Sequence, residues 1–252
     1  ALPIYQIASK WNVVDFMQRE RRKSATFGPL QCPLCHHTAP LPEFKQMDSH
    51  CIFGGGILLR HQCPACDLVF GPEKMLGLSM QELTQDYEWH YQAYQEGDST
   101  AQELRAFHAL NPKRDGCYLN FGAGAWSRSV QMLRQEGWQV YAYEPHASAS
   151  VGSEYSVQSK AALSGMRFDG IYSNNVLEHL RHPAEDLAYL RTLLNHGGTM
   201  AHATPCFEYL YEFTRFHLFF FLECSFYHRT FLSNENVTYN SYNHLNHYAL
   251  DN

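Results

Sequence analysis

The sequence has no long apolar run. Its most apolar stretch, residues 216–222, contains His217 and falls far short of the roughly 20 residues that a membrane-spanning helix requires. Residues 1–10 also lack the basic start and sustained apolar core of a secretory signal. We therefore expect a soluble, cytoplasmic protein that does not enter a membrane.

Charged residues are scarce, at 17% of the 252 residues, and basic ones are the scarcer kind. The net charge is -6 and is unevenly spread, because residues 1–75 carry eight Lys or Arg against six Asp or Glu, which leaves 11 against 19 for the remainder. An acidic body is unsuited to a phosphate backbone, so nucleic acid is a disfavoured partner. The basic residues near position 20 are interpreted as a solvated helix end rather than a nucleic-acid arm.

Four of the eight cysteines form two C-x-x-C pairs, and residues 54–56, all glycine, predict a hairpin turn between them. Each pair presents two thiolates to one side, and two pairs complete a tetrahedral zinc shell. Disulfides are not expected without secretion, and a redox C-x-x-C would need its own βαβ pattern. We predict a structural zinc ribbon with the ligands Cys32, Cys35, Cys63 and Cys66. Four nearby residues are alternatives for one ligand: His36, His37, His50 and Cys51. The isolated cysteines Cys117, Cys206 and Cys224 are expected in the core.

A glycine turn follows a short apolar run in the middle of the chain. The run at 118–121 stops at residues 122–124, Gly-Ala-Gly, and a helical pattern begins at once and ends at Gly137. A second apolar run, 139–143, ends on Glu144, 22 positions after Gly122. This layout is typical of a nucleotide-binding βαβ unit, in which missing Cβ atoms let the backbone approach the ligand and the acid accepts hydrogen bonds from ribose hydroxyls.

The third glycine of a dinucleotide fingerprint is absent, because Ser127 occupies its position. The sequence therefore lacks the glycine that allows close packing around a pyrophosphate, whereas a ligand with adenosine and no phosphate would not need that glycine. A nicotinamide-dependent sugar enzyme is also disfavoured because no Tyr-x-x-x-Lys pair is recognisable. Before the turn, Ser99 and Thr100 followed by Glu103 predict a capped helix that leads into the strand at 118.

A second strand end carries polar residues. The apolar run between Asp169 and the polar cluster predicts a buried parallel strand, and Asn174, Asn175, Glu178 and His179 lie at its carboxyl end. Ligands of open α/β sheets lie off the carboxyl ends of the strands, so this segment belongs to the expected site.

These motifs together resemble those of the class I S-adenosylmethionine-dependent methyltransferases. The turn and Glu144 match the family's first two motifs, with two departures: Asn120 stands where an acid is usual, and Trp126 replaces the third glycine. The segment from Phe168 to Pro183 closely matches the fourth motif, F-D-x-I followed by V-L-E-H-L and a proline. The zinc segment is loosely similar to that of bacterial sugar-nucleotide methyltransferases.

The resemblance implies a Rossmann-like methyltransferase domain, α/β and doubly wound with a mostly parallel sheet, preceded by a small N-terminal zinc ribbon. We expect three regions: 1–75 with the ribbon (ligands within 32–66), 76–115 as a helical linker or lid, and 116–252 as the S-adenosylmethionine-binding domain. The residues expected at the cofactor are Phe121, Gly122, Ala123, Gly124, Glu144, Pro145, Asn174, Asn175 and Val176.

The predicted function is methyl transfer from S-adenosylmethionine to a small-molecule acceptor, with a sugar nucleotide as first choice. His179 is the candidate acid–base residue, and a structural role is its alternative. Two other functions stay open. An RNA or protein methyltransferase would use the ribbon as reader, and a non-catalytic binding module on the same fold would explain Asn120 and Trp126. The sequence does not indicate the oligomeric state.

Overall fold

The computed structural model describes residues 2–24, 28–94, 97–124, 127–145, 154–205, 214–222 and 237–239. Trp126, Cys206, Cys224 and most of the last 19 residues, on which some expectations rested, lie outside these ranges. The chain forms two compact units, and each is interleaved in sequence. The first comprises residues 1–97, 178–182 and 205–228, and the second comprises 98–177, 183–204 and 229–252. Within the described ranges, every helix is too short or too polar to span a bilayer.

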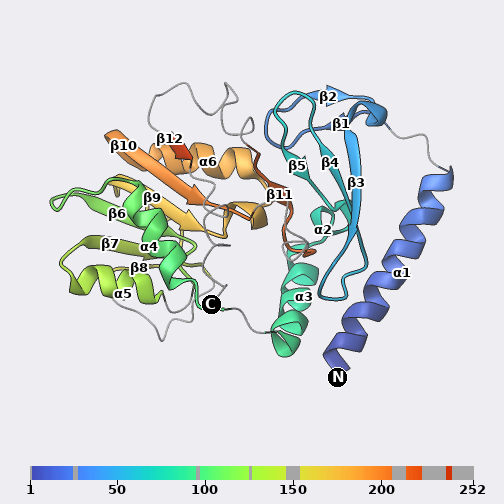
Figure 1. The fold of residues 1–252 in the computed structure, drawn as a ribbon, viewed down its shortest axis with the longest axis horizontal. Helices are drawn as coiled ribbons and strands as arrows, with labels where there is room; N and C mark the ends of the chain where they lie inside the picture. The colour runs from blue at the N-terminus through green and yellow to red at the C-terminus, as the bar shows by residue number, and fades with distance from the viewer. Residues whose placement is uncertain are drawn as a thin grey trace, which may run out of the picture. The chain divides into compact units, whose positions relative to one another are not determined.

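The first unit is built on small antiparallel sheets. A four-stranded sheet has the order β11-β5-β4-β3, and β1 and β2 form a separate hairpin. Its elements are α1 (Leu2–Ser24), β1 (Leu30–Gln31), β2 (Thr38–Ala39), η1 (Leu41–Glu43), β3 (Lys45–His50), β4 (Ile57–Gln62), β5 (Val69–Phe70), α2 (Glu73–Leu76), α3 (Met80–Ala93) and β11 (Phe219–Phe220) (Figure 1). The predicted turn is confirmed, since β3 pairs with β4 from Lys45↔Gln62 to His50↔Ile57. Gly54 and Gly56 have positive φ there, which suits glycine.

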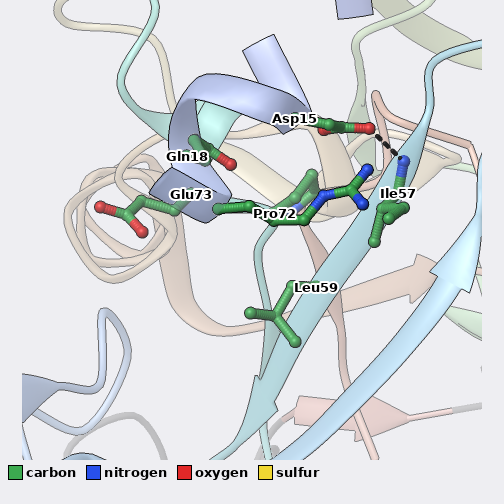
Figure 2. Close-up of a pocket in the computed structure, with 7 residues that line it drawn as sticks. Asp15, Gln18, Ile57, Leu59, Pro72 and Glu73 are labelled. Carbon is green, nitrogen blue, oxygen red and sulfur yellow. Dashed lines mark hydrogen bonds between the residues drawn. The ribbon is translucent and has the colours of Figure 1, made fainter. Parts of the chain in front are cut away.

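Buried charges hold the helices of this unit. Asp86 of α3 is fully buried and accepts hydrogen bonds from Trp11 Nε1 at 3.2 Å and from Arg215 Nε at 2.6 Å. Lys74 donates to Asp15 Oδ1 at 2.7 Å. The other oxygen of Asp15 accepts from the Ile57 backbone N at 2.7 Å, in a shallow pocket that holds none of the predicted site residues (Figure 2). Each buried carboxylate thus has a cation as well as a neutral donor, which such burial requires.

The second unit is a doubly wound parallel sheet, as predicted. All pairings in the six-stranded order β12-β10-β9-β6-β7-β8 are parallel. Its elements are α4 (Thr100–Ala109), β6 (Cys117–Phe121), α5 (Arg128–Gln135), β7 (Gln139–Tyr143), β8 (Ser156–Val157), β9 (Phe168–Asn174), α6 (Pro183–Thr192), β10 (Leu194–Ala203) and β12 (Val237–Tyr239) (Figure 1). The 3-10 turn η3 (Leu177–His179) crosses from this unit into the first.

The direction of the crossovers explains where a ligand belongs. From β6 the chain moves to β7 on one side, and from β9 it moves to β10 on the other. Right-handed crossovers therefore place α5 and α6 on opposite faces of the sheet. The order reverses between β6 and β9, and the carboxyl ends at such a switch point form the usual ligand crevice of an open α/β sheet.

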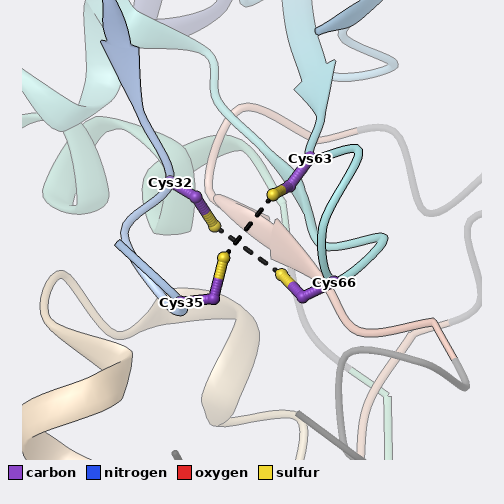
Figure 3. A group of neighbouring side chains, drawn as sticks. All are labelled: Cys32, Cys35, Cys63 and Cys66. Carbon is purple, nitrogen blue, oxygen red and sulfur yellow. Dashed lines mark hydrogen bonds between the residues drawn. The ribbon is translucent and has the colours of Figure 1, made fainter. Parts of the chain in front are cut away.

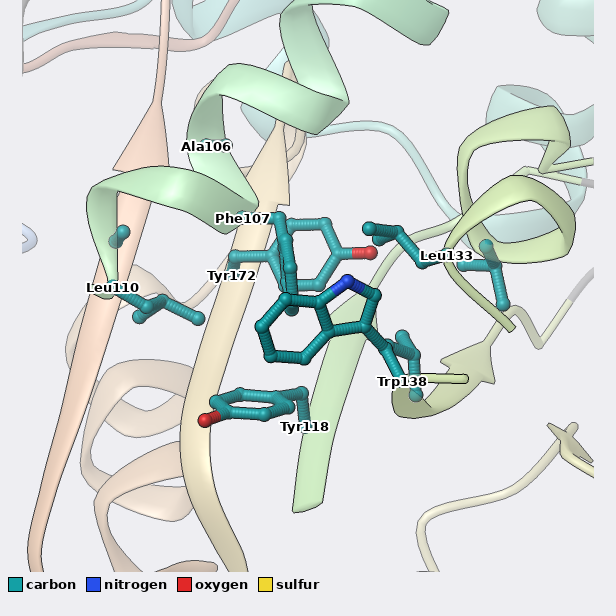
Figure 4. Packing of buried hydrophobic residues seen from close by; sticks show 10 residues of the cluster. Ala106, Phe107, Leu110, Tyr118, Leu133, Trp138 and Tyr172 are labelled. Carbon is teal, nitrogen blue, oxygen red and sulfur yellow. The ribbon is translucent and has the colours of Figure 1, made fainter. Parts of the chain in front are cut away.

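Aromatic packing fixes the helix α4 on the sheet. Phe107 is fully buried, and its ring contacts Tyr118, Trp138 and Tyr172 edge-on at centroid distances of 5.2, 5.1 and 5.5 Å. Figure 4 shows the rings of Phe107, Tyr118, Trp138 and Tyr172 gathered together below α4. Truncating such a buried ring to alanine costs about 3–5 kcal/mol. Strand β10 begins at Leu194, before Gly197 and Gly198, and its register against β9 shifts between Leu194 and Thr199.

Candidate functional site

The glycine turn after β6 is closed by backbone hydrogen bonds. The backbone N–H groups of Gly122 and Ala123 both donate to the Tyr143 carbonyl, at 2.9 and 3.0 Å. Gly122 has a φ of +77°, and a Cβ built on it would lie 2.5 Å from Val176 Cγ2. Gly124 has a φ of +69°, and no atom of a described residue lies within 4 Å of an added Cβ. The turn thus packs against Val176 at its first glycine and, among the described residues, is open at its second.

Glu144 lies beside this turn, as the βαβ pattern predicted. Its Oε2 accepts a hydrogen bond from the Gly124 backbone N at 3.1 Å. Its own backbone N donates to Val157 of β8 at 3.0 Å, which fixes the position from which the side chain extends. Pro145 follows and is exposed. The carboxylate and the open glycine therefore face each other at the end of β6 and β7.

The end of β9 adds two amides. Asn174 is the last residue of β9, and Asn175 has a positive φ of 53°. The Asn175 backbone N donates to the Ala203 carbonyl at 2.9 Å, which holds this unusual bend against β10. Together with the contact of Val176 on Gly122, the bend brings the carboxyl end of β9 to the glycine turn. The residues predicted at the cofactor are thus gathered at the switch point, where Phe121 ends β6 directly before the turn and its buried ring stacks on Tyr143 at 4.9 Å.

Sequence reasoning missed the principal role of Glu103. It predicted Glu103 as part of a helix cap, but the Ser99 side chain makes no cap hydrogen bond, and Asp98 Oδ1 instead accepts from the Thr100 backbone N at 2.9 Å. The Glu103 carboxylate turns inward and accepts a hydrogen bond from Asn120 Nδ2 at 2.9 Å. Because helical spacing is shared by caps and core positions, the sequence carried no signal that would separate the two.

The four predicted cysteines come together in the first unit. Their Sγ atoms all lie within 4.8 Å of one another, and no other described residue joins this group. The diagonal pairs Cys32–Cys66 and Cys35–Cys63 are 3.7 and 3.6 Å apart (Figure 3). A disulfide would require about 2.05 Å, whereas tetrahedral Zn–S bonds of about 2.3 Å imply S···S edges of roughly 3.8 Å. The geometry fits a tetrahedral metal. The hydrogen bond with Cys66 lowers the pKa of Cys32, which favours the thiolate form that a metal binds.

His179 belongs to a separate polar cluster, also in the first unit. Its Nδ1 lies 3.0 Å from the Phe216 carbonyl and 3.3 Å from the Tyr87 hydroxyl. A carbonyl only accepts, so the proton of the neutral ring belongs on Nδ1 and the lone pair on Nε2. Nε2 is 3.7 Å from Oε1 of the fully buried Glu178. This carboxylate would stabilise an imidazolium formed by protonation of Nε2. The centroid of the His217 ring lies 5.1 Å from that of the His179 ring.

The aromatic residues of α3 pack against the same cluster. Tyr87 stacks on Phe216 with a centroid distance of 4.2 Å and an interplanar angle of 16°, and His90 meets Phe216 edge-on at 4.9 Å. Tyr91 remains 51% exposed. Most of this aromatic segment therefore serves to pack α3 within its unit.

The chain was compared with known families and structures. The family described as a methyltransferase domain matches residues 89–240. No curated protein matches the chain. One similar solved structure is that of the glycopeptide N-methyltransferase MtfA, with 20% identity and a TM-score of 0.31, over 41% of this chain and 52% of that one. The chain thus spans about half the length of that structure, and a likeness of this size carries no argument about the acceptor.

Proposed function

Since this chain belongs to the methyltransferase domain family, we propose that it transfers a methyl group from S-adenosylmethionine to a small-molecule acceptor. The observation that carries this proposal is the arrangement at the switch point, where the open Gly124 faces Glu144 beside Asn174 and Asn175. Such a place suits an adenosine without phosphates, because the residues described there offer backbone, a carboxylate and amides and include no basic side chain.

Each residue there has a defined task in this proposal. Glu144 accepts hydrogen bonds from the ribose hydroxyls, for which its Gly124 bond pre-orients the side chain. The backbone at residues 122–124 approaches the nucleoside without hindrance from a side chain. Asn174, Asn175 and Val176 bound the adenine and methionine parts. When bound, the cofactor supplies a methyl group on a sulfonium that is already primed for in-line displacement, so the protein's main contribution is to hold donor and acceptor near contact distance.

His179 is the residue we propose for proton transfer. It follows Val176 by three positions in the chain. Its Nε2 takes the acceptor proton if the attacking atom is a hydroxyl, and the nearby Glu178 carboxylate stabilises the charge that results. An acceptor whose nucleophilic atom already has a free lone pair would need no such base.

The acceptor we propose is a sugar nucleotide or a comparable biosynthetic intermediate. Residues 76–252 are acidic, with 11 Lys or Arg against 19 Asp or Glu, and this favours a small molecule over an RNA as acceptor.

We further propose that the four-cysteine group binds Zn²⁺ in a structural role, because all four ligands of a closed tetrahedral shell come from the protein.

The test is a methyl-transfer assay with radiolabelled S-adenosylmethionine and a panel of nucleoside-diphosphate sugars, beside bulk RNA and protein. Labelled sugar nucleotide is expected. With that acceptor, His179→Asn should lower kcat about 10²–10⁴-fold if a hydroxyl is methylated, at unchanged S-adenosylhomocysteine affinity. His217→Asn, in the same cluster, is the matched control and should retain most of kcat. Label only in RNA or protein would reject the small-molecule acceptor, and absence of S-adenosylhomocysteine binding would favour a non-catalytic module.

A further inference from the structure

The Glu103 carboxylate of α4 accepts hydrogen bonds from four side chains. Its Oε1 accepts from Ser99 Oγ at 2.7 Å. Its Oε2 accepts from Asn120 Nδ2 at 2.9 Å, Ser127 Oγ at 3.0 Å and Ser129 Oγ at 2.5 Å. The residue is only 8% exposed. Four donors around one carboxyl group are the partners of the ionised form, which only accepts.

These partners lie on both sides of the glycine turn. Asn120 is two residues before Gly122 and is 1% exposed, and Ser127 is three residues after Gly124. Ser127 is also the N-cap of α5, since its Oγ accepts from the Val130 backbone N at 3.3 Å. One oxygen of Glu103 therefore ties the strand that enters the turn to the helix that leaves it.

Glu103 is surrounded by neutral partners in the part of the chain that the structure describes. Among the residues that the structure describes, no Lys, Arg or His forms an ion pair with Glu103, and all four of its donors are neutral. This differs from the buried Asp15 and Asp86 of the first unit, each of which pairs with a basic side chain at 2.6 or 2.7 Å. A buried carboxylate without a counter-charge creates a negative potential, which attracts a cation that binds nearby.

We propose that Glu103 is a positioning residue for the cofactor: it clamps both ends of the glycine turn, and its negative charge attracts the cationic amino-acid end of the ligand. The neutral Asn120 stands on the strand itself and relays this charge through its hydrogen bond to Glu103. The inference rests on the proposed function, because the cation that it invokes belongs to S-adenosylmethionine.

The experiment compares two ligands by calorimetry. S-adenosylhomocysteine carries an ammonium group, whereas 5′-methylthioadenosine has the same adenosine and sulfur without the amino acid. Glu103→Gln keeps the shape but removes the charge, so it should weaken S-adenosylhomocysteine binding about tenfold and methylthioadenosine binding less than about twofold. The exchange Glu103→Gln with Asn120→Asp returns a carboxylate to the pair and should restore most of the lost affinity.

Asp169→Asn is the matched control. Asp169 is an acid of the same unit that accepts from the Cys117 backbone N at 2.8 Å at the start of β9, the opposite end from Asn174. Its loss should not separate the two ligands. Equal weakening of both ligands in Glu103→Gln would reduce Glu103 to a clamp and overturn the proposal, as would unchanged affinity for both. If the wild-type protein binds neither ligand, the proposed function itself fails.

Discussion

Replacing Gly122 with alanine should damage the protein far more than the same change at Gly124. Both glycines have left-handed backbones, with φ of +77° and +69°, so each alanine pays the cost of about 1–2 kcal/mol of that conformation. Within the described residues, the new Cβ meets other atoms at position 122 and not at 124; these atoms are Val176 Cγ2 at 2.5 Å and Cγ1 at 3.0 Å. Overpacking of this kind adds about 1–3 kcal/mol. Gly124→Ala therefore serves as the reference for the backbone cost, and the difference between the two variants measures the contact with Val176.

The assay is thermal unfolding of both variants beside the wild type. The extra cost at position 122 should lower the Tm by a further 2–12 °C or so relative to Gly124→Ala, at about 2–4 °C per kcal/mol for a chain of this size. Val176→Ala added to Gly122→Ala removes the clashing methyl groups and should recover part of the difference. Equal Tm values for the two single variants would refute the view that the turn rests on Val176.

Two further predictions concern metal and pH. The purified protein should contain one zinc ion per chain. The variant Cys35→Ser should lose this zinc and have a lower Tm, whereas Cys117→Ser, which changes a cysteine outside the group, should keep it. Equal zinc content in the two variants would contradict the assignment. Burial lowers the pKa of His202 from 6.5 to about 4, so the unfolded chain binds a proton that the folded chain refuses, and stability is lost as the pH falls from about 6.5 towards 4. The loss amounts to on the order of 3 kcal/mol of the free energy of unfolding. The stability of His202→Gln should therefore depend less steeply on pH between about 6.5 and 4. Identical stability-versus-pH profiles for the variant and the wild type would show that His202 does not titrate in this way.

The fold was largely predictable because its signals are local. Two C-x-x-C pairs with a glycine turn between them, and a strand that stops at Gly122, each determine structure within a few residues. The end of β9 was equally clear, because a short apolar run after Asp169 stops at the polar residues Asn174 and Asn175.

What the sequence did not show depends on contacts between distant residues. Glu103 was read as a cap, yet it serves as the acceptor for Asn120 and Ser129, 17 and 26 positions away. Likewise, Asp86 pairs with Arg215 across 129 positions, and nothing in the local pattern of either residue indicates the other. The assignment of α3 to the first unit and of α4 to the second was not predictable either, because the sequence of a polar helix does not indicate which element it packs against.

The most direct test of the proposed cofactor site is calorimetric titration of S-adenosylhomocysteine into the wild-type protein and two variants of Glu144. Glu144→Ala should weaken binding by about 1–3 kcal/mol, or roughly 5–150-fold, through loss of charge-assisted hydrogen bonds to the ribose. Glu144→Gln retains an oxygen that can accept a hydrogen bond from the Gly124 backbone N but removes the negative charge. Its affinity for S-adenosylhomocysteine should therefore lie between those of the wild type and Glu144→Ala. Tight wild-type binding with this ranking is the predicted result; equal affinity in all three proteins would mean that the nucleoside does not lie on Glu144.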